Sequence, residues 1–439
     1  MFEKLFRFSQ YKTDLRTELL GGLTTFMTMA YIVVVNPAIL SFAGFPVGPS
    51  TVATVLTAVF GCLLMAFYAN KPIAVAPYMG ENAFIAFGLA AMHISWQQRL
   101  GAVFVSGCLF LILSVLHIRG WLANSISTSL KHAFAAGIGL FLTFIGMFET
   151  GICVSGAPAV PVKLGDFHSP PVLLAVATFF LMASLQYRKV KGAILIGIAF
   201  SAIVGTLLGF GQAPKAIFAM PFTGDYSLNA LAFKLDVPGV LQLSFFPLLL
   251  TLFLMSFLDT LGTLVGVGSA GDMLDEDGNF PDIEKPMLVD SLSCIFSSLV
   301  GSSTSGAFIE SATGIKEGAR TGLAALVCAV LFFACLFFLP LLEPLQHLKY
   351  AYAPALMSVG LLMMASVTKI DLEDLSEAVP AFATIVMMIF TYNIANGITA
   401  GLILYPLFKF CAGRGKDLHP GAIVLGALCL VYYVFGLPH

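Results

Sequence analysis

The sequence predicts an all-α protein that crosses a membrane many times. Of its 439 residues, 58% are hydrophobic and only 10% are charged, and the mean hydropathy is +0.93. Soluble domains carry roughly 45–50% apolar and about 25% charged residues. Apolar runs of about 17–25 residues, the length of a membrane-spanning helix, recur along the chain, and the alternating pattern of a membrane β-barrel is missing. The expected surrounding is a lipid bilayer, and a net charge of −2 predicts no nucleic-acid partner.

The apolar runs predict fourteen spans, of which the third and the tenth are interrupted. The other twelve are expected at about 17–43, 51–69, 98–117, 132–149, 171–187, 192–210, 242–268, 286–300, 321–342, 353–368, 378–393 and 397–411. A last apolar run, 421–436, either crosses the membrane or lies along it. Lys4, Arg7, Lys12 and Arg16 precede the first span, which by the positive-inside rule predicts a cytoplasmic N-terminus. The expected location is the bacterial cytoplasmic (inner) membrane. No cleavable signal is expected, because the first 20 residues are polar.

The two interrupted spans predict broken helices. In the third, Pro72 and Pro77 precede Gly80, and a proline pushes the residue before it to extended geometry, so a short extended piece should lead into a half-helix. The tenth, 302–316, is rich in Gly, Ser and Thr. Irregular backbone at membrane depth is tolerated only where it is buried in protein or lines a cavity. The sequence therefore predicts a binding site at this break.

Two local matches predict that the chain is duplicated. GENAFIAFG (80–88) aligns with IESATGIKEG (309–318), and QYRKVKGAILIG (186–197) with NIANGITAGLIL (393–404). Seven spans separate the segments of each pair, and an odd number inverts the second half relative to the first. Inverted repeats with broken helices in matching positions indicate a secondary transporter with a site near the membrane midplane.

Two acids in otherwise apolar segments are the first site candidates. Asp259 lies in FLDTLGT and Glu310 lies in the tenth span, where a charge costs at least about 2.5–3.5 kcal/mol. Either carboxylate, when ionised, can accept N–H groups of a planar heterocycle, and when protonated it can carry a coupling proton. The structural alternatives are a packing acid paired with Thr260 or Thr263 and, for Glu310, a helix-capping carboxylate.

Further candidates surround these acids. Asn82 offers both a donor and an acceptor to a base, and the unpaired amides that follow Gly80 and Gly306, including that of Ala307, are further donors. Thr263 lies one turn beyond Asp259. Phe84 and Phe308 can stack on a ring, although 40 phenylalanines make packing a strong alternative. Glu81 either carries a proton or pairs within the core, and Asp290, His132 and Glu149 are weaker candidates with structural explanations.

Enzyme, metal and cofactor sites are not expected. The seven histidines do not cluster, and neither HExxH, GxSxG nor a phosphate-binding loop occurs. The eight cysteines are scattered without a CxxC, which predicts packing residues. The loop 271–285 resembles a calcium-binding loop at Asp275, Asp277 and Gly278, but its first ligand would be Met273, so an exposed acidic loop is favoured. No cofactor is expected beyond a coupling proton.

At FLDTLGT, SSTSGAFIESATGIKEGARTG and APYMGENAFIAFG the sequence resembles the AzgA-like purine permeases, a branch of the nucleobase-ascorbate transporter superfamily with the UraA-type fold. The resemblance implies two inverted seven-helix repeats with short antiparallel strands in helices 3 and 10. It implies a core domain (17–117 and 242–342), a gate domain (120–210 and 350–411) and a C-terminal apolar segment (412–439).

The same resemblance implies proton-coupled, elevator-like uptake of hypoxanthine, guanine or adenine. The family's helix-8 acid, helix-10 acid and helix-3 amide correspond to Asp259, Glu310 and Asn82. Glu81 stands where the branch is commonly apolar, which leaves the proton stoichiometry open. An anion transporter of the same architecture and a channel remain as rival functions, and a homodimer through the gate domains is left open.

Overall fold

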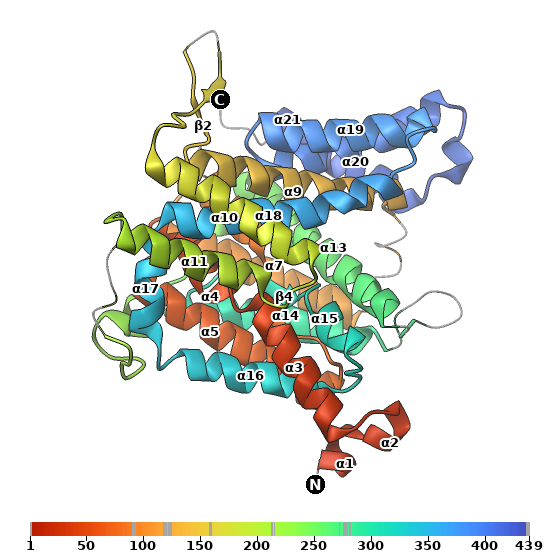
Figure 1. Cartoon of the computed structure of the whole chain (residues 1–439). Coiled ribbons are helices and arrows are strands. Elements are labelled where there is room, and N and C mark those ends of the chain that lie inside the picture. Colours follow the sequence, from red (N-terminus) through yellow and green to blue (C-terminus); the bar gives the residue numbers. More distant parts are fainter. Residues whose placement is uncertain are drawn as a thin grey trace.

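Helices make up nearly the whole fold (Figure 1). The computed structural model describes residues 2–89, 94–116, 121, 125–157, 160–211, 214, 216–271, 273–274, 280 and 282–435. In the first half the elements are α1 (Phe2–Phe6), α2 (Phe8–Tyr11), α3 (Leu15–Met29), α4 (Ile32–Ser41), α5 (Val47–Leu64), η1 (Met65–Ala69), β1 (Val75–Pro77), α6 (Met79–Ala83), η2 (Phe84–Gly88), α7 (Trp96–Val115), α9 (Thr128–Glu149), β2 (Cys153–Ser155), β3 (Val162–Leu164), α10 (Pro170–Tyr187) and α11 (Ala193–Leu207).

A connecting region of short helices leads into the second half. It contains η4 (Gly224–Tyr226), η5 (Leu228–Ala230), α12 (Val237–Val240) and η6 (Leu243–Phe245). The second half comprises α13 (Phe246–Ala270), α14 (Glu284–Val300), β4 (Ser305–Ala307), α15 (Ser311–Lys316), α16 (Gly322–Cys335), α17 (Leu339–His347), α18 (Lys349–Met364), η7 (Ala365–Lys369), α19 (Leu375–Phe390), α20 (Ile394–Cys411), η8 (Gly415–Asp417) and α21 (Pro420–Phe435). The predicted acidic calcium-like positions, Asp275, Asp277 and Gly278, lie outside the described residues.

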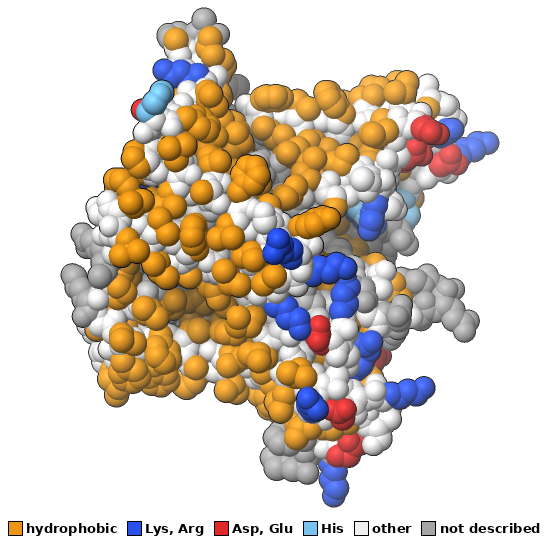
Figure 2. Space-filling model, in the orientation of Figure 1, with side chains coloured by type: hydrophobic (Ala, Val, Ile, Leu, Met, Phe, Trp, Pro, Cys, Tyr) orange, Lys and Arg blue, Asp and Glu red, His pale blue; other side chains and the backbone are white. Residues whose placement is uncertain are grey.

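The helices confirm a multi-pass membrane protein. Within the described residues, eight helical stretches are long and apolar enough to cross a bilayer, or nine if the bent pair α16 and α17 forms one span, and three shorter apolar helices accompany them. The predicted count of fourteen spans and the inverted repeat stay predictions. In Figure 2 hydrophobic side chains cover most of the visible face, and most charged side chains gather along the edge where α1 and α2 lie.

One predicted span ends differently. A single run was expected at 321–342, but α16 ends at Cys335 and α17 turns away from it by 83°. Pro340 lies in the first turn of α17 and Pro344 lies inside it. Because proline lacks the N–H that a continuing helix needs, α16 cannot run straight through this segment.

Local sequence explains where several helices begin and end. Gly301, with φ +98°, ends α14 in the left-handed conformation that glycine adopts without strain. Among the described residues, seven α-helices begin at a polar residue whose side chain accepts a first-turn backbone N–H, as N-caps do: Asp14, Ser95, Ser127, Asp236, Thr321, Asp374 and Asn393.

The helices pack in two groups. Helices α3, α4, α5, α7, α13, α14, α15 and α16 form one group, in which α4, α5, α13 and α14 contact the strands β1 and β4. Helices α9, α10, α11, α18, α19 and α20 pack mainly against one another. In Figure 1, α9, α18, α19 and α20 accordingly lie to one side of α3, α5, α14 and α16. The groups meet where α13 and α6 contact α9, α20 contacts η2, and α18 contacts α4.

Both interrupted segments contain a short strand. β1 and β4 pair antiparallel, with Val75 opposite Ala307, Ala76 opposite Gly306 and Pro77 opposite Ser305. This confirms the predicted strands in the two broken segments. A second pair, β2 and β3, lies in the loop between α9 and α10 and was not predicted.

Candidate functional site

The paired strands fix the two broken segments to each other. The N–H of Tyr78 donates to the carbonyl of Thr304 (3.0 Å), and the N–H of Phe308 donates to that of Ala74 (2.9 Å). All six strand residues are buried. α6 begins directly after β1, and α15 begins four residues after β4. The first turns of both helices are therefore held beside one rigid, buried ladder.

Asp259 lies on a polar stripe of α13. Ser256, Asp259, Thr260 and Thr263 are spaced i, i+3, i+4 and i+7, which places them along one face of a helix. Ser256 Oγ donates to Glu81 Oε2 (2.7 Å) and Thr260 Oγ1 donates to Asp290 Oδ2 (2.8 Å). Asp259 is only partly buried, and its side chain forms no hydrogen bond with any described residue. Its carboxylate is thus an ionisable acceptor on this stripe that no described residue uses.

Glu310 lies between β4 and α15. It occupies the N-cap position of α15, but its side chain makes no capping hydrogen bond. Instead Glu310 Oε1 accepts the hydroxyl of Tyr31 (2.8 Å), which lies between α3 and α4. The side chain is partly buried. The geometry therefore does not favour the capping alternative.

Asp290 organises the middle of the site. Its Oδ2 accepts the N–H of Ala307 (2.9 Å), the hydroxyl of Thr260 and, at 3.4 Å, the hydroxyl of Tyr78. Sequence analysis treated it as a weak, structural candidate, and its contacts are those of a structural pin between α14, β4 and α13. The amide of Ala307 is consequently not free for a ligand. Gly306 lies in β4, not at a helix start, and a Cβ there would lie 2.2 Å from Tyr78 Oη.

We expect Asp290→Ala to destabilise the protein. The substitution orphans the buried amide of Ala307, which alone costs about 1–3 kcal/mol, and it frees Thr260 from its acceptor. The measurement is the melting temperature of the purified protein in detergent, with exposed Asp166→Ala as the matched control. An unchanged melting temperature for the Asp290 variant would show that this carboxylate does not hold β4.

Asn82 is fully buried and faces another amide. Its Nδ2 donates to Asn36 Oδ1 (2.6 Å), while its Oδ1 is buried without a partner. Asn36 in turn donates to Thr54 (2.7 Å) and Ser302 (3.2 Å). The predicted site amide therefore belongs to a network that joins α4, α5, α6 and the segment before β4, with one acceptor left over.

Glu81 is the most enclosed acid of the group. Its side chain is completely buried, Oε2 accepts Ser256, and Oε1 has no partner. Asp259 and Asp290 lie close enough for their charges to act on it. Three carboxylates therefore lie close together: Glu81 on α6 and Asp290 on α14 are completely buried, and Asp259 on α13 is partly buried.

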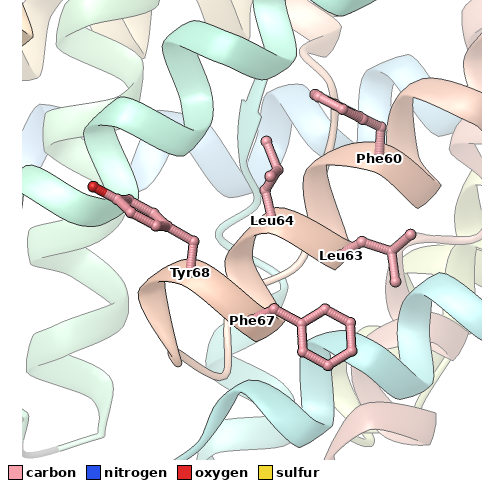
Figure 3. Close-up of a pocket in the computed structure, with 5 residues that line it drawn as sticks. All are labelled: Phe60, Leu63, Leu64, Phe67 and Tyr68. Carbon is pink, nitrogen blue, oxygen red and sulfur yellow. The ribbon is translucent and has the colours of Figure 1, made fainter.

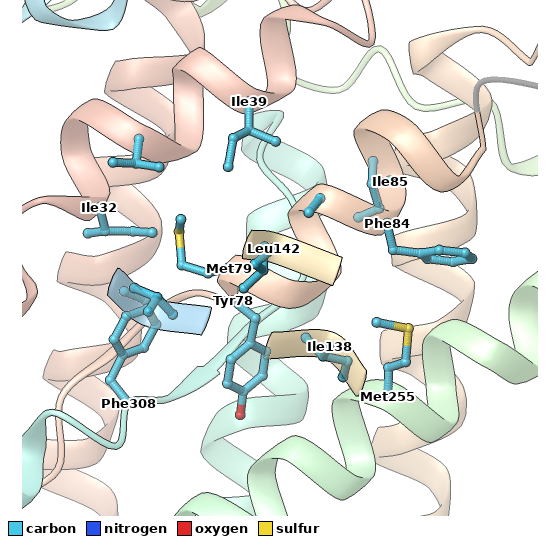
Figure 4. Close-up of a cluster of buried hydrophobic side chains, with 14 of the residues drawn as sticks. Ile32, Ile39, Tyr78, Met79, Phe84, Ile85, Ile138, Leu142, Met255 and Phe308 are labelled. Atoms are coloured by element: carbon cyan, nitrogen blue, oxygen red, sulfur yellow. The ribbon is translucent and has the colours of Figure 1, made fainter. Parts of the chain in front are cut away.

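The two aromatic candidates, Phe308 and Phe84, lie in different places relative to the strands. Phe308 stacks on Tyr78 with ring centroids 6.4 Å apart and planes 5° apart, and both rings lie beside the strands in Figure 4. Phe84 leaves its helix away from this pair, near Met255 (Figure 4). Gly80 lies where α6 meets α9, since a Cβ there would approach Ile138 to 2.5 Å. Phe308 is therefore better placed than Phe84 to line a site at the strands.

Three residues that contact the candidates, Tyr31, Tyr78 and Asn36, are not among the residues that the sequence predicts for the site. Each supplies a polar atom that contacts a candidate residue. Tyr78 is 212 positions from its partner Asp290 in the chain, and Tyr31 is 279 positions from Glu310. The one available signal was indirect: Tyr31 and Asn36 are polar-tipped residues inside the first predicted span, and Tyr78 stands between Pro77 and Gly80.

A hollow on the surface of α5 and η1 does not fit a polar ligand. It is lined by Phe60, Leu63, Leu64, Phe67 and Tyr68 (Figure 3). Phe67 and Tyr68 are about half exposed, at 53% and 51%. A lining with one hydroxyl offers little to a nitrogenous ring, so the carboxylates at the strands remain the candidate site.

Comparison with known proteins agrees with this architecture. The model of the "Permease family" matches residues 16–400. A putative permease of Methanocaldococcus jannaschii is 43% identical over 99% of this chain and 98% of its own. The adenine permease AdeP of Escherichia coli is 37% identical over 99% of this chain and 96% of its own. The guanine/hypoxanthine permease PbuG of Bacillus subtilis is 38% identical over 98% of this chain and 99% of its own.

Solved structures show the same fold at low identity. The transmembrane domain of the cyanobacterial bicarbonate transporter BicA has a TM-score of 0.65 at 17% identity and covers 88% of this chain and 97% of its own. SLC26A9 has a TM-score of 0.63 at 11% identity, and the match covers 91% of this chain and 66% of SLC26A9. Identities this low carry the fold and not the substrate. The family match and the relatives indicate a transporter rather than an enzyme, and the chain belongs to the permease family, in agreement with the predicted resemblance to the AzgA-like permeases.

Proposed function

We propose that this protein is a secondary active transporter that takes up purine nucleobases, hypoxanthine, guanine or adenine, together with protons. The observation that carries the proposal is the partly exposed carboxylate of Asp259, which no described residue engages, on the helix that packs against β4. Purine rings carry N–H donors, and a hydrogen bond to a charged acceptor contributes about 1.5–3 kcal/mol. Relatives named adenine and guanine/hypoxanthine permeases support this substrate class.

Glu310 supplies the second acceptor in this proposal. Glu310 lies between β4 and α15, and Asp259 lies on α13. Since α13 and α15 contact each other, the two acids come from neighbouring elements. Asn82 would orient a ring or exocyclic atom through its unpaired Oδ1. Phe308 would stack on the ring, and Thr263 lies one turn beyond Asp259 on the same face. In this proposal the base is bound through the acceptor oxygens of Asp259, Glu310 and Asn82, which match the N–H donors of the ring.

The anion alternative is not favoured. The structural neighbours include a bicarbonate transporter, but an anion site needs Arg, Lys or open helix amides. Here the strand region carries Glu81, Asp259, Asp290 and Glu310, and the amides of Ala307 and Phe308 are used within the fold. Acids would repel an anionic substrate.

Proton coupling is supported by the proximity of three acids, Glu81, Asp259 and Asp290, of which the first and the last are completely buried. Carboxylates that share a region of low dielectric cannot all be charged without a compensating cation. Among the described residues no group of His, Cys, Asp or Glu forms a metal site. Asp290 is held by three hydrogen bonds within the fold, so in this proposal Asp259 and Glu81 bind protons. Glu310, beside β4, is the third proton-binding acid, and Glu81 is the one that the ligand does not reach.

Movement of the core past the gate would carry the base across. The two helix groups correspond to the proposed core domain (17–117 and 242–342) and gate domain (120–210 and 350–411), and each group packs mainly within itself. An inverted repeat would place the two broken segments at matching positions of the halves, and the antiparallel pairing of β1 with β4 is compatible with that arrangement. The charged edge at α1 and α2 (Figure 2) supports a cytoplasmic N-terminus.

The test is uptake of radiolabelled purines into proteoliposomes, competed with uracil, xanthine and sulfate. The wild-type protein should accumulate a purine only when a proton gradient is imposed. Glu81→Gln, which mimics a permanently protonated acid, should equilibrate the purine equally with and without the gradient. Gradient-driven accumulation by this variant would remove Glu81 from coupling, and competition by sulfate alone would overturn the substrate class.

Asp374→Asn is the matched control for the coupling test. Asp374 lies outside the membrane-spanning helices, and hydrogen bonds from the hydroxyl and the N–H of Ser376 lower its pKa to about 2. A lowered pKa means that its stabilising charge is present above pH 3.8 and lost only as the pH falls towards 2. Its titration therefore cannot produce pH dependence near neutrality, and this variant should keep the coupling of the wild type.

A further inference from the structure

Tyr31 contacts the proposed site from a part of the chain in which the sequence predicts no site residue. The residue lies between α3 and α4, its side chain is 1% exposed, and its hydroxyl donates to Glu310 Oε1 at 2.8 Å. A buried tyrosine hydroxyl needs a polar partner. Here that partner is one oxygen of the carboxylate proposed to hold the base.

The scaffold around this bond is rigid. Thr28 Oγ1 and Thr313 Oγ1 are 3.1 Å apart. A Cβ on Gly314 would lie 2.2 Å from the carbonyl oxygen of Gly21 and 2.3 Å from Thr25 Oγ1. The backbones of α3 and α15 are therefore in close contact, and Tyr31 and Glu310 lie at adjoining ends of the two helices. Neither residue can shift far without the other.

We propose that Tyr31 is a positioning residue of the purine site, an inference that rests on the proposed function. Its hydroxyl engages Oε1 and so fixes the rotamer of Glu310 with Oε2 directed to the ligand. A hydrogen bond to a charged oxygen is about twice as strong as a neutral one. Holding the carboxylate before the ligand arrives lowers the entropy that binding must overcome. Tyr31 thus acts on affinity through Glu310 and does not itself touch the base.

The test is Tyr31→Phe, which keeps the buried ring and removes only the donor. We expect the KM for the purine and its dissociation constant from purified protein to rise about tenfold, with kcat changed less than twofold. The matched control is Tyr226→Phe. Tyr226 donates to Glu343 Oε2 at 2.7 Å, which is the same kind of bond, here between η4 and α17, and this variant should keep the KM of the wild type.

Each outcome decides between a positioning role and its rivals. An unchanged KM and dissociation constant in Tyr31→Phe, or a loss of kcat at constant KM, would overturn the inference while the proposed function stands. Failure of this variant to insert and fold, with Tyr226→Phe normal, would show that the bond holds the fold and would equally overturn it. If the wild-type protein binds no purine, the proposed function fails, and the inference fails with it.

Discussion

Asp259→Asn should abolish purine uptake while the protein still inserts and folds. The Asp259 side chain forms no hydrogen bond with any described residue, so the substitution breaks no contact within the fold. Asparagine keeps the shape but removes the charge, and its amide can turn a donor toward a donor on the base. Loss of a charged hydrogen bond costs about 1.5–3 kcal/mol, and an unpaired ligand N–H adds about 1–3 kcal/mol. Together these predict a decrease in uptake of about 100-fold or more.

The measurement for this variant is initial-rate uptake together with purine binding and the melting temperature in detergent. Asp166→Asn is the control, because Asp166 is an exposed loop acid with a 71% exposed side chain. The Asp259 variant should have a wild-type melting temperature, in contrast to Asp290→Ala. Wild-type uptake by Asp259→Asn would remove this carboxylate from the site and with it the observation that carries the proposed function.

The features that could be predicted from the sequence are those set by composition and by the free-energy cost of an unusual residue in a membrane-spanning segment. Acids inside apolar runs are conspicuous because they are expensive, so Asp259, Glu310 and Glu81 could be selected without a structure. Pro72 and Pro77 exclude a continuous helix, and β1 lies just there, at Val75–Pro77. Most long apolar runs, such as those that form α5, α9 and α20, begin and end within a few residues of the prediction.

What the sequence could not predict is the pairing between distant residues. Asp290 was undervalued because nothing near it in the chain shows that it faces the amide of Ala307 in β4. Thr260 was considered as a partner for Asp259, yet it points to Asp290, since residues adjacent on a helix face different neighbours. The amide at Ala307 was expected to be free, whereas β4 extends the backbone and α15 begins only at Ser311. The residues on both sides of Pro340 are apolar, so the hydropathy of the sequence predicts one continuous span and gives no sign of the bend after α16.

Glu310→Gln should reduce purine binding as strongly as Asp259→Asn, but for a more specific reason. Glutamine keeps an acceptor oxygen for the hydroxyl of Tyr31, so the bond at 2.8 Å can persist and the rotamer is retained. What disappears is the charge, and the second oxygen becomes an NH₂ donor. A purine N–H that met an acceptor then meets a donor, so a favourable contact becomes a repulsive one. We expect about a 100-fold or larger increase in the dissociation constant, since 1.4 kcal/mol corresponds to tenfold.

The Glu310 prediction separates site chemistry from scaffold. Tyr31→Phe removes the positioning donor and should cost about tenfold, whereas Glu310→Gln retains an acceptor for that donor and should cost more, because it removes the acceptor that the base itself uses. Glu373→Gln, an exposed acid before α19, is the matched control and should bind as the wild type does. If the order were reversed, with Tyr31→Phe the more damaging variant, the hydroxyl and not the carboxylate would be the group that contacts the ligand. If both Asp259→Asn and Glu310→Gln transported fully, the purine site would have to lie elsewhere than at the paired strands.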